Sequence, residues 1–225
     1  MFLPLLVGLF WGAPLVAREV EHGTHRLVWT QGVSRRRWAM VKFGLVGAAV
    51  LAASAVYGLG LSWWFAPGSL TGSRFGVVAF DMQGLVPMGY TLFAVALGAY
   101  AGTIWPKVVP AMAAALAGFI VVRIVLTVFA RPNYLPALTH TVPDRGPNEA
   151  NPGNWQLARE FRNPDGTPIM TNANGETVFP SDMLVWERYQ PADRFWLFQG
   201  IETGIYVGLA LLLLYLAIRR IRKLS

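Results

Sequence analysis

Five apolar runs, separated by polar segments, set the pattern of this chain. They cover residues 1–16, 43–65, 85–104, 108–130 and 196–218. Each of the last four has about 20 residues or more, which at 1.5 Å per residue is enough for a helix to cross roughly 30 Å of hydrocarbon. The pattern therefore predicts an all-α polytopic membrane bundle of about five transmembrane helices.

The first run is short for a complete crossing. It does not have the form of a secretory signal, because no basic residue precedes its apolar core. We expect instead that the chain begins inside a helix pair, with an upstream helix missing. A plain short first helix is the alternative.

The distribution of lysine and arginine predicts how the chain is oriented. The segment at 18–42, the turn at Lys107 and the tail after residue 218 are basic, whereas 66–84 holds only Arg74. Short basic loops face the cytoplasm. We therefore expect a transmembrane helix at 1–17, a cytoplasmic segment at 18–42, three transmembrane helices at 43–130, an extracytoplasmic domain at 131–195, and a transmembrane helix with a basic cytoplasmic tail at 196–225.

The long polar segment at 131–195 contains turn and strand signals. The run 163–166 reads Asn-Pro-Asp-Gly, a strong turn, and Asn174-Gly175 between two short apolar runs is typical of a β-hairpin. Trp155, Leu157 and Phe161 fall on one face of a possible third strand. A small β-containing extracytoplasmic domain between the last two helices is favoured over a disordered loop. His140, the only histidine in this segment, is interpreted as a plain loop residue.

Glycine pairs spaced by four residues indicate close helix packing. They are Gly8/Gly12, Gly98/Gly102 and Gly204/Gly208. Residues four apart share a helix face, and glycine lets two backbones approach closely. The pairs favour a packed bundle over separate membrane anchors.

Two charged residues lie inside apolar runs, and a third lies just before one. Arg123 and Glu202 are each placed toward the outer end of their helix, and Asp81 precedes the run at 85–104. Charges in a bilayer usually pair, line a wet cavity, or extend toward the headgroups. Two interpretations stay open: snorkelling of each side chain to the interface, or an Arg123–Glu202 contact that fastens the two helices flanking the outer domain.

Composition excludes several function classes. Charged residues make up only 14% of the chain, and the net charge is +7. The basic residues flank the apolar runs, which favours membrane lipids over nucleic acid as the partner. There is no cysteine, and the histidines lie in loops, so neither thiol catalysis nor a metal site is expected. No G-x-x-x-x-G-K-[ST] phosphate loop is present. We expect no enzyme activity and no cofactor on this chain.

The segment at 18–42 has the form of two short helices at the membrane face. Gly32 breaks any helix from its first half, and Ser34 is a suitable N-cap for a helix that leads into the second span. Glu19 and Glu21 are expected to pair with basic residues of a partner or with the arginines at 35–37. From the residues alone, an amphipathic interfacial connector is the simplest interpretation.

A family resemblance adds to this interpretation. The pattern consists of Glu19, Glu21, Gly23, Thr24, Leu27, then Thr30-Gln31-Gly32-Val33-Ser34-Arg35, then Lys42. It resembles the cytoplasmic loop of ABC transporter permeases of the type-2 exporter class. Gln31-Gly32 stands where that class has a single proline, as in a subgroup common in actinobacteria that exports drugs and antibiotics. The run 189–196, followed by Gln199, Ile201 and Glu202, is similar to the same subgroup.

The resemblance implies a transport subunit in the bacterial plasma membrane, crossing it several times. Residues 18–42 would form coupling helices that dock on a separate ATP-binding subunit, which would carry the ATP and Mg²⁺. The implied coupling residues are Glu19, Glu21, Gly23, Thr24, Leu27, Gly32, Ser34 and Arg35. A second permease subunit, identical or different, is also implied. The alternative is a membrane-anchored binding or sensor protein that acts through its outer domain without an ATPase.

Overall fold

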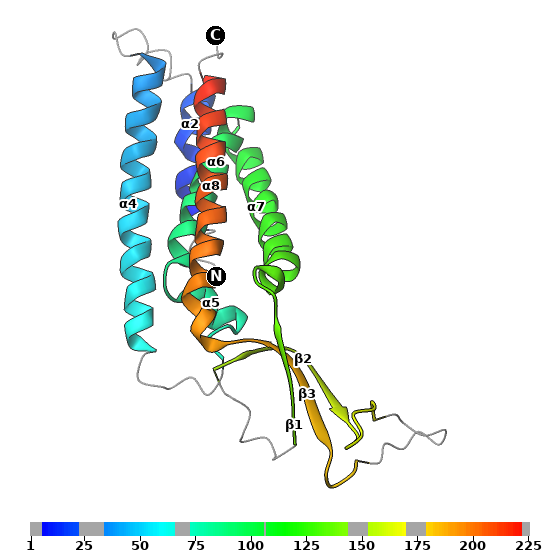
Figure 1. The fold of residues 1–225 in the computed structure, drawn as a ribbon. Helices are drawn as coiled ribbons and strands as arrows, with labels where there is room; N and C mark the ends of the chain where they lie inside the picture. The colour runs from blue at the N-terminus through cyan, green and yellow to red at the C-terminus, as the bar shows by residue number, and fades with distance from the viewer. Residues whose placement is uncertain are drawn as a thin grey trace.

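The computed structural model describes residues 6–22, 34–65, 73–105, 107–143, 153–169 and 179–221. Within these ranges the chain is mostly helical, with one small antiparallel sheet at one end of the helix bundle (Figure 1). The ends of α2 (Pro14–Glu21) and α8 (Phe195–Ile221) and the start of α4 (Arg35–Trp64) lie at the opposite end of the bundle from the sheet. The polar segments expected on opposite membrane faces are therefore far apart.

The remaining helices complete the bundle. They are η1 (Gly8–Gly12), α5 (Val77–Met82), α6 (Val86–Ile104), α7 (Val108–Val125), η2 (Leu126–Ala130), η3 (Arg131–Asn133) and η4 (Ala192–Arg194). Helix α6 is central: it contacts α2, α4, α5, α7, α8 and η1. Both η1 and η2 are π-helical, and η3 and η4 are short 3₁₀ turns.

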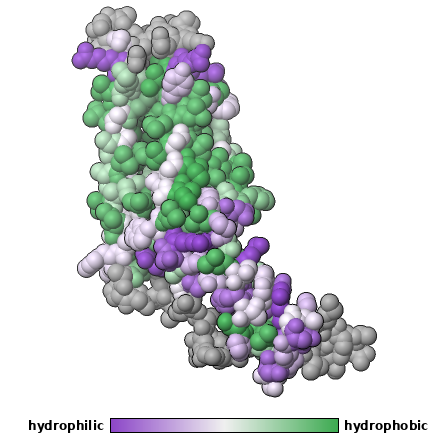
Figure 2. All heavy atoms as spheres, viewed as in Figure 1, coloured by the Kyte–Doolittle hydropathy of each residue, from purple (hydrophilic) through white to green (hydrophobic). Residues whose placement is uncertain are grey.

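Three continuous helical stretches among the described residues are long and apolar enough to cross a membrane. They are Arg37–Trp64, Val108–Asn133 and Ala192–Ile221. Their outer faces expose large apolar side chains, including Val56, Val109 and Leu211. Figure 2 shows the apolar surface along the bundle, with polar residues gathered toward its two ends and on the sheet. Such a continuous apolar surface fits lipid rather than water. The count of five crossings stays a prediction.

Two of the three glycine pairs lie in one close interface. A Cβ on Gly8 would stand 2.6 Å from the Cβ of Ala94, and one on Gly98 would stand 2.6 Å from the backbone nitrogen of Ala13. Gly12 and Gly102 are similarly crowded, so η1 and α2 press directly against α6. The third pair, Gly204/Gly208, lies on an open face of α8, because a Cβ on either residue would meet no described atom within 4 Å.

Both boundaries expected around the polar segment at 18–42 fall inside helices. Helix α2 continues past residue 17 to Glu21, and α4 begins at Arg35, before residue 43. The residues at 18–21 and 35–42 include no glycine or proline, so helical backbone bonding continues from the flanking apolar runs into the polar segment. Ser34 is the N-cap of α4, as expected: its Oγ accepts a hydrogen bond from the backbone N–H of Arg37 at 3.3 Å.

The sheet confirms a β-containing domain between α7 and α8. Its order is β1 (Leu138–Pro143), β3 (Leu184–Gln190), β2 (Trp155–Arg162), with β3 antiparallel to both neighbours. A bulge between Gln156 and Ala158 interrupts the alternation on which the expected common face of Trp155, Leu157 and Phe161 depended. The expected hairpin at Asn174-Gly175 lies outside the described residues.

The interpretation of His140 as a loop residue is wrong. His140 lies in β1, opposite Glu187 in β3, and its Nε2 stands 3.4 Å from Glu187 Oε2. Its ring also contacts the Tyr189 ring edge to face, with centroids 4.7 Å apart. The strand was missed because the run 138–143 has few apolar residues and both its faces are largely exposed.

An aromatic cluster joins the sheet to the bundle. Trp155 of β2 stacks on Phe75 with ring centroids 5.5 Å apart, and Phe75 packs edge to face on Phe195 and Phe198 of α8. Phe80 of α5 also packs on Phe195. Burial of these rings fixes where the sheet domain sits, directly over the ends of α5 and α8.

Candidate functional site

Four charged side chains from four elements meet at the end of the bundle nearest the sheet. They are Asp81 of α5, Arg123 of α7, Arg131 of η3 and Glu202 of α8. The side chains of Asp81 and Glu202 are fully buried, and Arg131 is 1% exposed. Two positive and two negative charges leave the cluster neutral, which is the condition for burying charges in a medium of low polarity.

Arg131 contacts both carboxylates of the cluster. Its Nε donates to Glu202 Oε2 at 2.7 Å, and its Nη2 donates to Glu202 Oε1 at 2.7 Å, a bidentate arrangement. The same Nη2 lies 2.9 Å from Asp81 Oδ1 and 3.0 Å from the hydroxyl of Tyr90. The guanidinium also lies 4.2 Å from the centre of the Phe80 ring. Arg131 thus holds both carboxylates.

Arg123 of α7 pairs with the same two carboxylates. Its Nη1 donates to Glu202 Oε1 at 3.0 Å, and its Nη2 forms an ion pair with Asp81 Oδ2. Its guanidinium lies over the Tyr90 ring, 4.1 Å from the centroid. Of the two interpretations of Arg123 and Glu202, the structure shows the contact and not snorkelling.

Tyr90 occupies the middle of the cluster. Its hydroxyl lies within hydrogen-bonding reach of Asp81 and Glu202 and accepts from both arginines. Tyr134, just beyond η3, donates to Glu202 Oε2 at 3.4 Å. Burial raises the pKa of the Tyr134 hydroxyl well above its usual value, and the Glu202 carboxylate raises it further. Tyr134 therefore stays protonated and remains a donor.

A π-helical turn brings the two arginines to the same side of one helix. Arg123 and Arg131 are eight residues apart. In a regular α-helix eight residues turn by about 800°, roughly 80° more than two full turns. In η2 the backbone N–H of Arg131 donates to the carbonyl of Leu126, five residues earlier, and this wider turn absorbs the excess rotation.

A tight elbow between α5 and α6 positions Asp81. Gly84 has φ +68°, which favours glycine, and its N–H donates to Ser62 Oγ of α4 at 2.9 Å. Gln199, one turn before Glu202, accepts from the N–H groups of Leu85 and Val86 at 3.0 Å each. Its Nε2 donates to the carbonyl of Phe80 at 2.8 Å. One buried amide therefore satisfies both ends of the elbow.

Arg131 and Tyr90 are members of the cluster that sequence reasoning missed. Arg131 directly follows the apolar run at 108–130, where a basic residue is ordinary at a membrane boundary. An α-helical wheel also places it away from Arg123, so only the π-turn brings it in. Tyr90 lies within an apolar run, where its ring fits without a polar partner. The available signal was the number of charges near the outer ends of the spans: Asp81, Arg123, Arg131 and Glu202.

The residues singled out in the segment at 18–42 are only partly described. Glu19 forms an ion pair with Lys42, linking α2 to α4, and Glu21 Oε2 accepts the N–H of Val108 at 3.1 Å, which caps the start of α7. Arg35 begins α4. The other predicted positions, Gly23, Thr24, Leu27 and Gly32, lie outside the described residues.

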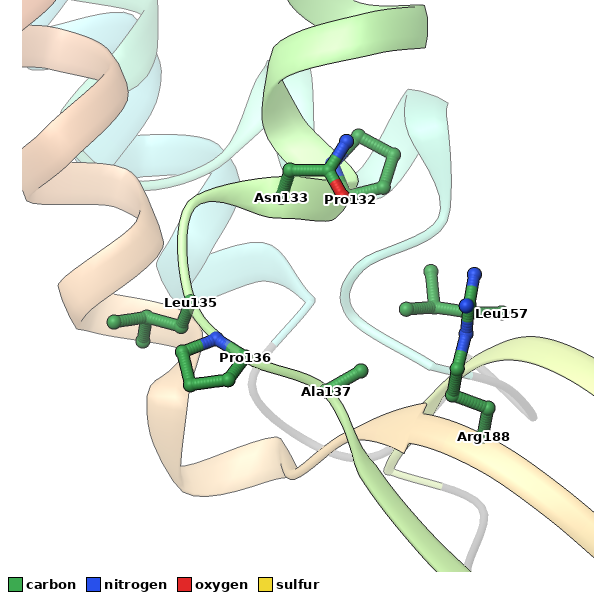
Figure 3. Close-up of a pocket in the computed structure, with 7 residues that line it drawn as sticks. All are labelled: Pro132, Asn133, Leu135, Pro136, Ala137, Leu157 and Arg188. Atoms are coloured by element: carbon green, nitrogen blue, oxygen red, sulfur yellow. The ribbon is translucent and has the colours of Figure 1, made fainter.

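A small open cavity of about 260 Å³ lies where the chain leaves η3 for the sheet. Figure 3 shows its lining, with the connector from Pro132 to Ala137 on one side and Leu157 and Arg188 on the other. Arg188 supplies the charge among the residues that line it. Among the described residues no group of three or more His, Asp and Glu side chains is arranged to hold a metal ion.

Comparison with known families decides the class. A family model described as ABC-2 membrane transporter related matches residues 1–131. The chain belongs to this family. The matched part includes the segment at 18–42 and, in the buried cluster, Asp81, Tyr90, Arg123 and Arg131, whereas Glu202 lies beyond it. No curated protein and no solved structure matches the chain.

Membership in the ABC-2-related family makes this chain a membrane transport protein of the permease type. The three apolar helices and the exposed apolar faces agree with that placement. The charged cluster is then a polar junction inside a transporter bundle. It joins α5, α7 and η3, which precede the sheet domain in the chain, to α8, which follows it. Removing one partner from such a buried group costs about 3–5 kcal/mol, so the cluster stabilises the described arrangement of this end of the bundle.

Proposed function

We propose that this chain is the membrane-spanning subunit of an ATP-driven exporter in the bacterial plasma membrane, working with a separate ATP-binding subunit and a second permease subunit. The family match over residues 1–131 carries the proposal. The chain crosses the membrane five times, with the sheet domain on the outer face. Its substrate is a hydrophobic drug, an antibiotic, a lipid or a glycan.

In this proposal the segment at 18–42 receives the movement of the ATPase. Two features of the described residues support that role. Helices α2 and α4, which flank the segment, both pack on the central α6, and the Glu19–Lys42 ion pair joins their ends. Glu21 adds a link to the start of α7. A displacement of the segment would therefore reach three helices through rigid connections rather than through a flexible loop.

The test measures partner binding and stimulation. The tagged chain should co-purify an ATP-binding cassette subunit and raise its ATP hydrolysis. Replacing Gly23 and Thr24 with leucine should abolish stimulation while the protein still inserts. Gly60→Leu is the matched control, because a side chain there meets open space on α4. The proposal fails if no ATP-binding subunit associates, or if the double variant stimulates hydrolysis as well as the control; the first result would favour a sensor.

A further inference from the structure

The charged cluster depends on the π-helical turn η2, which lies between Arg123 and Arg131. A π-turn is a rare and less favourable arrangement that occurs mostly as single turns, often at functional sites. Here it lies between the two arginines and gives them a common orientation. The same stretch in α-helical form would keep Arg123 in place and rotate Arg131 by about 80°. The ionic cluster is thus compatible with only one of the two helical forms.

The turn itself contains a polar group that the present arrangement leaves unpaired. Thr127 Oγ1 in η2 is buried and has no hydrogen-bond partner among the described residues. In an α-helix a threonine hydroxyl bonds to the carbonyl four residues earlier, which for Thr127 is that of Arg123. The α-helical form would therefore gain that bond, along with regular backbone bonding, while it gives up the contacts of Arg131. Each form therefore makes hydrogen bonds that the other form lacks.

From these observations we propose that η2 is a conformational switch for the end of the bundle beneath the sheet domain. In the π form Arg131 joins Asp81 of α5 to Glu202 of α8 and holds that end closed. In the α form Arg131 leaves both carboxylates, while Arg123 keeps the carboxylates partly compensated. The end of the bundle then opens between α5, α8 and the connector to the sheet. The switch rests on the proposed export function, for which it supplies an outer gate.

Deleting one residue from η2 tests the switch directly. Removing Val128 leaves Arg123 and Arg131 seven residues apart, which in an α-helix is about 700° and restores their common side without a π-turn. Val128 is 56% exposed, so its removal takes no side chain from the core. The deletion variant should keep the cluster but have only one helical form. Val128→Ala is the matched control, because it alters the same side chain and keeps the chain length.

The readout is opening, measured on purified protein without an ATPase. The native chain has no cysteine, so Thr203→Cys introduces a single thiol beside Glu202; the Thr203 hydroxyl is buried and has no partner among the described residues. A small water-soluble thiol reagent should label it at least ~10-fold more slowly in the Val128 deletion than in Val128→Ala. Thermal stability of the deletion variant should equal or exceed that of the control.

The outcomes separate the switch from the export function. Equal labelling rates in the two variants overturn the switch. A loss of stability in the deletion, as large as that of an Arg131 replacement, overturns it too, because the π-turn would then not be what aligns the arginines. If labelling is slower in the deletion but no ATP-binding subunit co-purifies with the chain, the switch stands and the export proposal is overturned. Slower labelling together with lost ATPase stimulation supports both.

Discussion

Replacing Arg131 with methionine should be among the most destabilising single changes in this protein. The change removes hydrogen bonds from Arg131 to Glu202 at 2.7 Å, to Asp81 at 2.9 Å and to Tyr90 at 3.0 Å. It leaves two buried carboxylates facing one arginine. Removing one partner of a buried ion pair costs about 3–5 kcal/mol, a large share of a stability that is typically about 5–15 kcal/mol.

The measurement is unfolding in mixed micelles of a mild detergent and dodecyl sulfate, followed by the fluorescence of the nine tryptophans. Arg188→Met is the matched control, since Arg188 lies exposed on β3 and an exposed replacement should stay within about 0.5 kcal/mol. Adding Glu202→Gln to Arg131→Met restores neutrality, so the double variant should be more stable than the sum of the two single changes by about 0.5–3 kcal/mol. If Arg131→Met costs no more than Arg188→Met, the cluster does not hold the bundle together.

Four further results are expected. Arg123→Glu and Glu202→Arg should each lower the amount of folded protein, and the double swap should recover part of the loss in a detergent-solubility assay; losses that simply add would mean no energetic coupling. Gly98→Leu should prevent folding, because a Cβ there meets backbone at 2.6 Å, whereas Gly204→Leu should be tolerated in the same assay. Gln199→Leu should destabilise by about 1–3 kcal/mol, since it leaves the N–H groups of Leu85 and Val86 unpaired; a neutral effect in the micelle titration would contradict the role given to the elbow. Cysteine at Asp165 should react with an impermeant reagent on intact cells and cysteine at Arg37 should not, and the opposite pattern would reverse the orientation.

The helical part of the fold follows from the sequence because it depends on hydropathy averaged over runs of about 20 residues. Runs of apolar residues predict helices whatever their exact contacts, and Ser34 predicts the start of α4 because capping is local. The spacing of Gly8 and Gly12 predicts close packing, which Gly8 makes against Ala94, whereas the same spacing at Gly204 and Gly208 lies on an open face. Helices α2 and α4 extend into the polar segment at 18–42 because polarity marks where lipid should end, not where backbone hydrogen bonding ends.

The candidate site was only partly predictable, because its geometry depends on an irregular turn. Arg123 and Glu202 could be singled out because a charge inside a membrane is costly. The helix face on which Arg131 lies could not be predicted in that way. A helical wheel assumes about 100° per residue throughout, and η2 departs from that value. The bulge in β2 has the same effect on a smaller scale, since one extra residue changes which side chains share a face. Irregular turns are set by tertiary contacts, which a pattern does not contain.

The Glu19–Lys42 ion pair has a thermodynamic consequence for any partner of the connector between α2 and α4. The two residues are 23 positions apart in the chain, and they lie on helices that both pack on α6. Bringing together the ends of a free segment of that length costs on the order of 3 kcal/mol of chain entropy. Folding of the bundle has already met this cost before a partner arrives. A protein that binds the connector therefore binds a segment whose two ends are already held together, and none of its binding energy is spent on closing that segment.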